Sequence, residues 1–254
     1  MKTLKEGTLT GVSLGPGDPE LMSRKAWSAL HSQAIWCYPV KKKSGVSYAL
    51  DIVSRAQLSP PEKSFALIFP MTHDSSILSK HWIAAAQQVL THLQQGQDVV
   101  FLVEGDASTY STFAHLARTI SHLNDQVDIQ IIPGISAYHA AAAKTKVSLA
   151  DTDDTIAILP AGYGIETINS MLKDFDTLVL LKVKPLLDQI IDFLEQKELL
   201  DQAIFIEKVG SPQEHIVHDL LSLRHQKVNY LSLILLRNPN RQRGTVIRGC
   251  RKKL

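Results

Sequence analysis

The segment "VVFLVEGDASTYSTF", residues 99–113, decides the fold and raises the question of function. Its continuous apolar run is typical of a parallel strand that is buried on both faces of a sheet. Two acids, Glu104 and Asp106, follow around Gly105, and hydroxyl side chains come next. Loops at the carboxyl ends of such strands bind small molecules in α/β proteins. Phosphate sites avoid negative charge, so the loop predicts a ligand that is cationic or rich in hydroxyl groups.

Similar apolar runs alternate with amphipathic segments on both sides of this stretch. Such alternation predicts βαβ units and a mostly parallel sheet. The expected strands are 8–14, 34–38, 65–69, 98–103 and 127–132, and the expected helices are 20–31, 46–57, 76–95, 109–122 and 135–145.

The residue composition changes after about residue 149, where the polar and acidic segment "LADTDDTIAILPAGYG" leads into a new strand. We therefore expect two α/β domains, residues 1–148 with a mostly parallel sheet and residues 149–254 with a mixed sheet. A loop rich in turn formers, "NPNRQRG", joins the last two expected strands as an antiparallel pair. Further strands of the second domain are expected at 176–182, 202–207, 228–237 and 244–248.

Composition excludes several classes of protein. The chain has 254 residues, of which 44% are apolar and 20% charged, as in ordinary globular proteins. A net charge of +2 is too mild to predict a nucleic-acid partner. No apolar run is long enough to span a membrane, and the start is too polar for a signal-peptide core. The chain has only two cysteines, Cys37 and Cys250, which implies no disulfide framework, so we expect a cytoplasmic protein. The spacing of its His and Cys residues does not predict a metal site.

The first strand ends in a second specialised loop, "GVSLGPGDPELM", residues 11–22. Gly15 and Gly17 allow positive φ and close approach of a ligand to the backbone. Their spacing fits neither the dinucleotide fingerprint nor a P-loop. S-adenosylmethionine combines ribose hydroxyls, an amino group and a sulfonium without phosphate, and it suits the acidic loop of residues 104–112. The alternative is that Asp106 merely caps the following helix.

These loops, with "IIPGISA" at 131–137, resemble in order and spacing those of the tetrapyrrole methylases, the two-domain methyltransferases of corrin and sirohaem synthesis. The likeness continues through "ILPAG", "LVLLKV" and "IEKVGSPQEHIV" and covers nearly the whole chain. Each motif alone is weak, but the ordered set is specific.

Within the family, the resemblance implies methylation of carbon 20 of precorrin-2 or its cobalt form (cobalt-factor II) in cobalamin synthesis. "CYPVKKKSG", "FPMTHD" and "YSTF" carry this implication. The relatives that methylate uroporphyrinogen have an Asp where this chain has Pro39. One departure from the family is Ala107, which replaces the proline of the usual Gly-Asp-Pro loop.

The resemblance also implies a homodimer and an S-adenosylmethionine site in a cleft between the two domains. Lys182 stands where relatives often have Met, so only a backbone contact is expected there. The cofactor-binding residues carried over by motif position are Pro16, Gly105, Asp106, Thr109, Ser111, Thr112, Ser136, Ala137, Ala161, Lys182 and Gly210.

Methyl transfer from a sulfonium depends mainly on positioning, which contributes up to about 7–11 kcal/mol in favourable cases. A proton must then leave carbon 20; the sequence does not identify the base, and Glu104 and Tyr110 are the candidates nearest to the site in sequence. Precorrin-2 carries eight carboxylates, so Lys41, Lys42 and Lys43 are candidates for substrate binding. The alternative for the three lysines is a solvated loop.

Two other functions stay open. Relatives of the same fold methylate other corrin positions, a modified histidine of a translation factor, or ribosomal RNA. An RNA substrate would call for a more basic chain. A nucleotide-binding α/β module without methyl transfer would instead show phosphate-binding glycines and fewer acids after the fourth strand.

Overall fold

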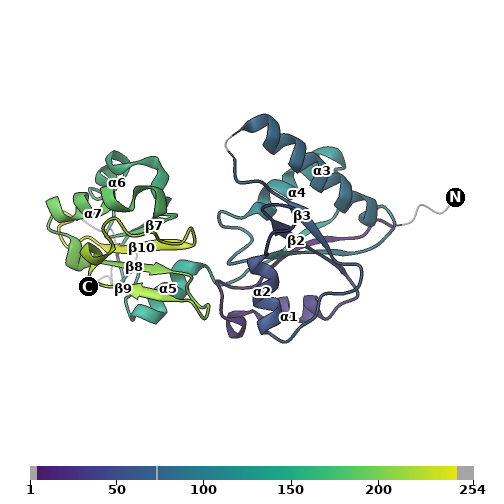
Figure 1. Cartoon of the computed structure of the whole chain (residues 1–254), viewed down its shortest axis with the longest axis horizontal. Coiled ribbons are helices and arrows are strands. Elements are labelled where there is room, and N and C mark those ends of the chain that lie inside the picture. The colour runs from purple at the N-terminus through teal and green to yellow at the C-terminus, as the bar shows by residue number, and fades with distance from the viewer. Residues whose placement is uncertain (1–4, 73, 245–254) are drawn as a thin grey trace, which may run out of the picture. The chain divides into compact units, whose positions relative to one another are not determined.

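A computed structural model describes residues 5–72 and 74–244 (Figure 1). Close contacts divide the chain into two compact units, residues 1–137 and 138–254. The domain boundary expected from the sequence, between residues 148 and 149, stays a prediction. Within the described ranges, none of the helices is both long enough and apolar enough to cross a lipid bilayer.

The first unit is built on a parallel sheet in the order β3-β2-β4-β1-β5. Strand β4 pairs with β2 on one side and with β1 on the other, so the loops after these strands meet at one edge. Four of these strands lie within the ranges expected from their apolar runs, whereas β2 continues two residues beyond its expected end at residue 38. The strands are β1 (Leu9–Ser13), β2 (Ile35–Val40), β3 (Phe65–Ile68), β4 (Val99–Val103) and β5 (Ile129–Ile132).

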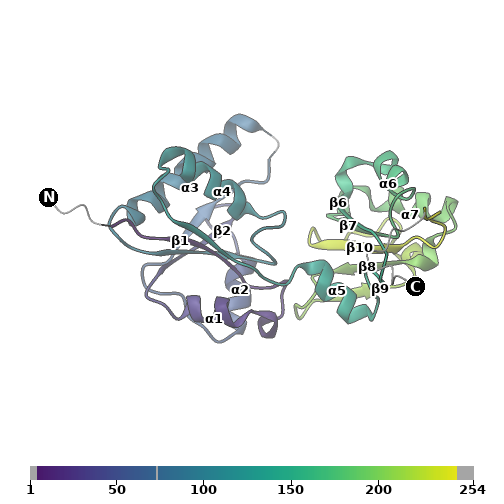
Figure 2. The same ribbon diagram turned by 180° about the vertical axis from the view of Figure 1, so that it is seen from behind.

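Helices cover both faces of this sheet, with α1 and α2 on one side and α3 and α4 on the other (Figure 1 and, from behind, Figure 2). Alternate β4 residues separate the two cores. Val100 and Leu102 belong to the cluster under α1 and α2, whereas Phe101 packs with α3 and α4. The helices are α1 (Arg24–Leu30), α2 (Tyr48–Arg55), α3 (Ser75–Leu93) and α4 (Thr112–Leu123).

Side-chain caps fix where two helices begin, and both begin later than expected from periodicity. Ser23 accepts a hydrogen bond from the Ala26 amide, so α1 starts at Arg24 rather than at residue 20. Ser111 accepts from the Phe113 amide, so α4 starts at Thr112 rather than at residue 109. A capping hydroxyl requires extended backbone at its own position, which excludes the preceding residues from the helix.

The second unit has a mixed sheet in the order β6-β7-β10-β8-β9, as expected. Strands β6 and β7 are parallel, and β10 runs antiparallel to both β7 and β8. The range expected for β10, 228–237, is too long by four residues, and the strand expected at 244–248 lies largely outside the described residues. The strands are β6 (Ile156–Pro160), β7 (Thr177–Leu181), β8 (Ala203–Glu207), β9 (His215–Val217) and β10 (Ser232–Arg237).

Helices α6 (Ile165–Met171) and α7 (Leu187–Gln196) bury their apolar faces on one side of this sheet. Ile190 and Leu194 of α7 are fully buried in the same core cluster as Phe205 of β8. Helix α5 (Ala137–Thr145) is rich in alanine, which allows close packing. The unit therefore has its own hydrophobic core.

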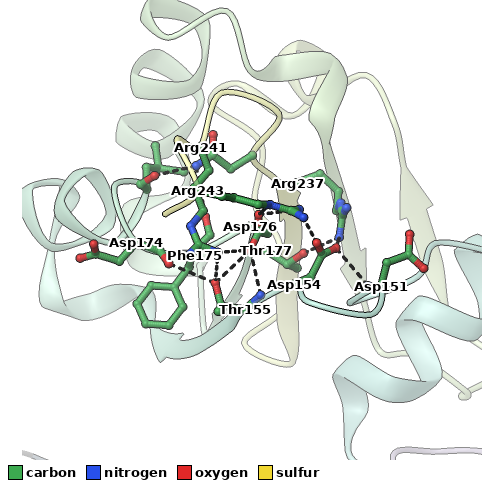
Figure 3. Close-up of polar contacts among 12 residues, drawn as sticks. Asp151, Asp154, Thr155, Asp174, Phe175, Asp176, Thr177, Arg237, Arg241 and Arg243 are labelled. Carbon is green, nitrogen blue, oxygen red and sulfur yellow. Dashed lines mark hydrogen bonds and ion pairs between the residues drawn. The ribbon is translucent and has the colours of Figure 1, made fainter. Parts of the chain in front are cut away.

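A cluster of acids and arginines holds the segment after β10 to the starts of β6 and β7 (Figure 3). The carboxylates of Asp154 and Asp176 are 2% and 3% exposed. Arg243 binds both acids, with its Nε 2.9 Å from Asp176 Oδ1, and Arg241 also binds Asp176. Arg237 lies 3.1 Å from Asp154. These ion pairs fasten residues 237–243 to the amino-terminal edge of the sheet.

Candidate functional site

Three loops of the first unit meet at the carboxyl ends of β4, β1 and β5. The Leu14 amide donates to the Val103 carbonyl at 2.8 Å, and the chain then pairs once more through Gly15 and Gly105. The Gly105 amide donates to the Gly15 carbonyl at 2.7 Å, and the reverse bond is 3.3 Å. The structure thus brings together the two glycine loops that the sequence singled out.

Glycines are required here for two different reasons. Gly15 and Gly105 both have φ +78°, which only glycine adopts without strain. A Cβ built at Gly105 would meet no atom within 4 Å, so the backbone there faces open space. A Cβ at Gly134 would lie 2.4 Å from the Ser13 Cβ and 2.9 Å from the Gly105 carbonyl oxygen. The loop after β5 therefore packs directly on the loop after β4.

Asp106 is the brace between these loops. Its carboxylate, in a residue only 8% exposed, accepts hydrogen bonds from the amides of Gly134 at 2.8 Å and Ser108 at 2.9 Å. The hydroxyls of Ser108 and Thr109 donate to it as well. Burial alone would raise the pKa of Asp106, but these hydrogen bonds outweigh it and hold the pKa below its usual range. Asp106 does not cap α4, because Ser111 does.

Ala107 strengthens the same loop. Its amide donates to Ser13 Oγ at 2.8 Å, and both residues are fully buried. Proline, which relatives usually have at this position, could not donate this bond. Ala107, in place of the usual proline, therefore adds a hydrogen bond to this loop.

Tyr110 is held in an unusual backbone conformation just beyond this brace. Its φ is +50° and its side chain is 51% exposed. Left-handed backbone at a bulky residue costs free energy and is common at functional sites. Tyr110 lies between Asp106 and the cap Ser111, both of which accept hydrogen bonds from backbone amides.

Glu104 differs from Asp106 although only one residue separates them. The side chain is partly buried, and in the described part of the chain no hydrogen bond or ion pair to its carboxylate is found. Burial raises the pKa of Glu104 to about 7, and the positive charge of Lys41 opposes the rise. A carboxyl group that titrates near neutrality is suited to proton transfer.

The three lysines after β2 are exposed, and a turn closed by the bond from the Gly45 amide to the Lys42 carbonyl carries them. Lys41 is the one whose charge acts on Glu104. Because β2 and β4 are paired, Lys41 and Glu104 follow neighbouring strands at the same edge. Lys42 and Lys43 have the surroundings expected of a solvated loop.

The other cofactor candidates of the first unit lie on the same three loops. Pro16 is buried in the loop after β1, and Ser136 is 7% exposed in the loop after β5. Ala137 begins α5, and Thr112 begins α4. The three loop segments 14–18, 104–112 and 133–137 contain no lysine or arginine. Their chemistry of hydroxyls, amides and acids does not suit phosphate.

The candidates of the second unit also lie at strand ends. Ala161 is fully buried directly after β6, and Gly210 follows β8 with φ +77°. Lys182 follows β7 with φ +57°, and its amide donates to the Ser232 carbonyl at 2.9 Å. Lys208 after β8 is also left-handed, with φ +49°.

Ser232 is a residue that sequence reasoning missed. It begins β10 between the ends of β7 and β8 and is 5% exposed, yet its hydroxyl has no partner in the part of the chain described. A buried hydroxyl without a partner costs free energy. No sequence pattern could have found it, because its burial depends on the pairing of β10.

Within residues 5–72 and 74–244, no group of three or more His, Cys, Asp or Glu side chains is placed to hold a metal ion. Cys37 is fully buried in β2, and burial raises the pKa of its thiol. Cys250 lies outside the described residues.

The chain is an α/β protein in which loops lined by glycines, hydroxyls and acids meet at the strand ends of the first sheet. A family model described as Tetrapyrrole (Corrin/Porphyrin) Methylases matches residues 8–223. The chain belongs to this family, which confirms the resemblance seen in the sequence.

Relatives match over nearly the whole chain. The Cobalamin biosynthesis protein CobIJ of Mycobacterium tuberculosis (strain H37Rv) is 28% identical, and the match covers 96% of this chain and 48% of CobIJ. The chain thus spans about half the length of that relative. The Precorrin-2 C(20)-methyltransferase of Sinorhizobium sp is 29% identical, with 91% and 95% covered. The Cobalt-precorrin-2 C(20)-methyltransferase of Salmonella typhimurium (strain LT2) is 30% identical, with 91% and 96% covered.

The fold also matches a solved structure, the Uroporphyrin-III C-methyl transferase from Thermus thermophilus complexed with S-adenyl homocysteine. The TM-score is 0.62 at 18% identity, with 90% of this chain and 97% of the other covered. At this identity, the match supports the fold alone.

Proposed function

We propose that this protein transfers a methyl group from S-adenosylmethionine to carbon 20 of precorrin-2 or of its cobalt form, in cobalamin synthesis. The observation that carries the proposal is the likeness, over more than nine-tenths of both chains, to the C(20)-methyltransferases of Sinorhizobium and Salmonella. The names of those two relatives differ in whether cobalt is present. Both forms of the substrate are therefore candidates.

The first unit fits the proposed methyl donor. When bound, S-adenosylmethionine supplies the methyl group on a sulfonium. The open space over Gly105 leaves room for a ligand against the backbone, and the neighbouring loops present acids and hydroxyls without a basic residue. This chemistry favours a cation that carries ribose hydroxyls over a phosphate. The Thermus relative was solved with the corresponding product.

The proposed cofactor contacts retain the residues predicted from the sequence, with one change of role. Asp106 acts mainly by fixing the positions of Gly105 and Gly134, because its oxygens already accept protein hydrogen bonds. The first unit contributes Pro16, Gly105, Asp106, Thr109, Ser111, Thr112, Ser136 and Ala137. The second unit contributes Ala161, Lys182 and Gly210, the lysine through its backbone.

Methyl transfer from a sulfonium releases a neutral thioether, which is already a good leaving group. The protein therefore contributes mainly by holding the methyl donor and the attacking carbon rigidly in line. The paired glycines and the Asp106 brace supply that rigidity in the first unit. Lys41, Lys42 and Lys43 supply positive charge for the substrate carboxylates.

The deciding experiment is incubation with S-adenosylmethionine and either precorrin-2 or its cobalt form. We expect one added methyl by mass spectrometry and its placement at carbon 20 by NMR of the product. A methyl at another carbon would assign the chain to a different corrin position. No methyl on either substrate, with the folded protein still binding S-adenosylhomocysteine, would reject the proposed substrate.

We also propose a homodimer in the cytoplasm, as the family resemblance and the cysteine content led us to expect. Light scattering coupled to gel filtration tests the dimer. The proposal predicts a mass near twice 28.1 kDa, and a mass near 28.1 kDa would contradict it.

A further inference from the structure

We propose that Glu104 is the catalytic base that removes the proton from carbon 20 after methyl transfer. This inference rests on the proposed function and assigns a base that the sequence did not identify. Three features of Glu104 carry it: its place in the fold, a carboxylate that accepts no hydrogen bond within the described residues, and its charged neighbour Lys41.

The place of Glu104 is fixed by the loop that follows it. Glu104 directly precedes Gly105, whose backbone pairs with Gly15 and faces open space. Asp106 anchors the next residues to Gly134. A side chain at position 104 is therefore held beside the space proposed for the methyl donor, on a rigid support.

The carboxylate of Glu104 has no role in holding the fold. Asp106 accepts bonds from two amides and two hydroxyls, whereas no hydrogen bond or ion pair to Glu104 occurs in the described ranges of the chain. Partial burial of an unpaired carboxylate costs free energy, and burial raises its pKa to about 7. Groups of this kind concentrate at active sites.

The charged groups around Glu104 favour a substrate beside it. Lys41, at the end of the neighbouring strand β2, is the cation whose charge lowers the pKa of Glu104. Asp106 on the same loop faces Gly134, and Asp18 on the loop after β1 caps its own turn at Glu20. Lys41 can attract a peripheral carboxylate of the tetrapyrrole, which brings the ring close to Glu104.

The step balances without a further reactant. Carbon 20 attacks the methyl carbon with an electron pair of the conjugated ring, the carbon–sulfur bond breaks, and its electrons stay on sulfur. Carbon 20 then carries both hydrogen and methyl, and the ring carries a positive charge. The C–H bond breaks, its electrons restore the conjugation, and the proton passes to the Glu104 carboxylate.

The test compares Glu104→Gln with the exposed control Glu62→Gln on the substrate that the wild type methylates. We expect kcat to fall about 100-fold or more in Glu104→Gln, with KM and S-adenosylhomocysteine affinity unchanged. The wild-type rate should rise with pH through about 7, whereas the residual rate of Glu104→Gln should not follow this profile. Glu104→Asp, with a shorter carboxylate, should recover part of the rate.

A stability measurement separates this role from a structural one. The folded pKa of Glu104 lies above its unfolded value, so ionisation of the carboxyl destabilises the fold as pH rises through about 7. Glu104→Gln should therefore melt at a higher temperature than the wild type at pH 8. An active wild type with an equally active Glu104→Gln would overturn the role of Glu104 alone. A wild type that methylates no tetrapyrrole would overturn the proposed function with it.

Discussion

Two sets of acids that are at least partly buried, among the residues that the structure describes, have very different surroundings. Asp154 and Asp176, at the amino-terminal edge of the second sheet, are paired with three arginines (Figure 3). Glu104, at the carboxyl-terminal edge of the first sheet, makes no hydrogen bond or ion pair in the described part of the chain, and the charge of Lys41 does not offset the effect of its burial. Paired acids stabilise a fold, whereas an unpaired acid at a strand end is retained at a cost to stability. Asp154 and Asp176 therefore hold the fold, whereas Glu104 is available for chemistry.

Asp106 shows that position alone does not decide the role. It lies in the same loop as Glu104, but four hydrogen bonds make it part of the scaffold. Its neighbours Gly105 and Gly134 are the surfaces that it positions. The loop thus combines one acid that builds the site and one that is free to react.

The largest expected effect is the loss of stability when one of the paired acids is replaced. Asp176→Asn removes the charge that holds Arg241 and Arg243 and should lower the free energy of unfolding by about 3–5 kcal/mol. Urea denaturation of the variant measures this change. Asp174→Asn, an exposed control two residues away, should change it by less than about 0.5 kcal/mol. Equal effects in the two variants would show that the cluster does not stabilise the second unit.

The cluster of Asp154, Asp176 and three arginines also predicts that the fold loses stability at low pH. Hydrogen bonds and arginines overcome the effect of burial and lower the pKa of Asp176 to about 2. A carboxyl group whose pKa is lowered on folding stabilises the fold above its unfolded pKa of about 3.9, and that stabilisation is lost as the pH falls toward 2. The melting temperature should drop over this interval and drop less steeply in Asp176→Asn. Parallel curves for the two proteins would contradict the assignment.

A substitution between the two loops of the site tests the scaffold at Asp106. Gly134→Ala places a Cβ 2.4 Å from the Ser13 Cβ, so the loops must separate. We expect a loss of about 1–3 kcal/mol in stability and weaker binding of S-adenosylhomocysteine by calorimetry. Gly162→Ala is the matched control for stability, because a Cβ there meets no atom within 4 Å. Unchanged binding in Gly134→Ala would show that the contact between the loops does not shape the site.

The smallest expected effect concerns the loop after β4. Ala107→Pro restores the residue usual in the family and removes the donor to Ser13 Oγ, which should cost about 1 kcal/mol. Ser13→Ala should cost a similar amount, and the two losses should not add, because both variants break one bond. Additive losses in a double-mutant cycle would contradict a shared hydrogen bond.

The sequence predicted the architecture well where long apolar runs and ordered loop motifs mark it. Every expected strand of the first unit was found, because buried parallel strands are continuous apolar runs. Strand β9 was missed because only His215–Val217 form it and its pairing with β8 depends on the folded sheet. The caps Ser23 and Ser111 moved two helix starts that periodicity placed too early.

The site was predictable in its chemistry but not in its division of roles. The motifs identified Gly105 and Asp106, yet nothing in the sequence showed that Asp106 binds Gly134. The state of Glu104 depends on burial and on missing partners, which are properties of the folded chain. Ser232 became visible only through the pairing of β10.

NMR titration of the side-chain carboxyl carbon of Glu104, assigned with Glu104→Gln, measures most directly how Glu104 differs from the hydrogen-bonded acids. The structure predicts a midpoint near pH 7 for Glu104. It predicts a midpoint below the ordinary aspartate value for Asp106 in the same spectra. A Glu104 midpoint near the ordinary value of about 4.3 would contradict the account, because the carboxylate would then be as well solvated or paired as any other.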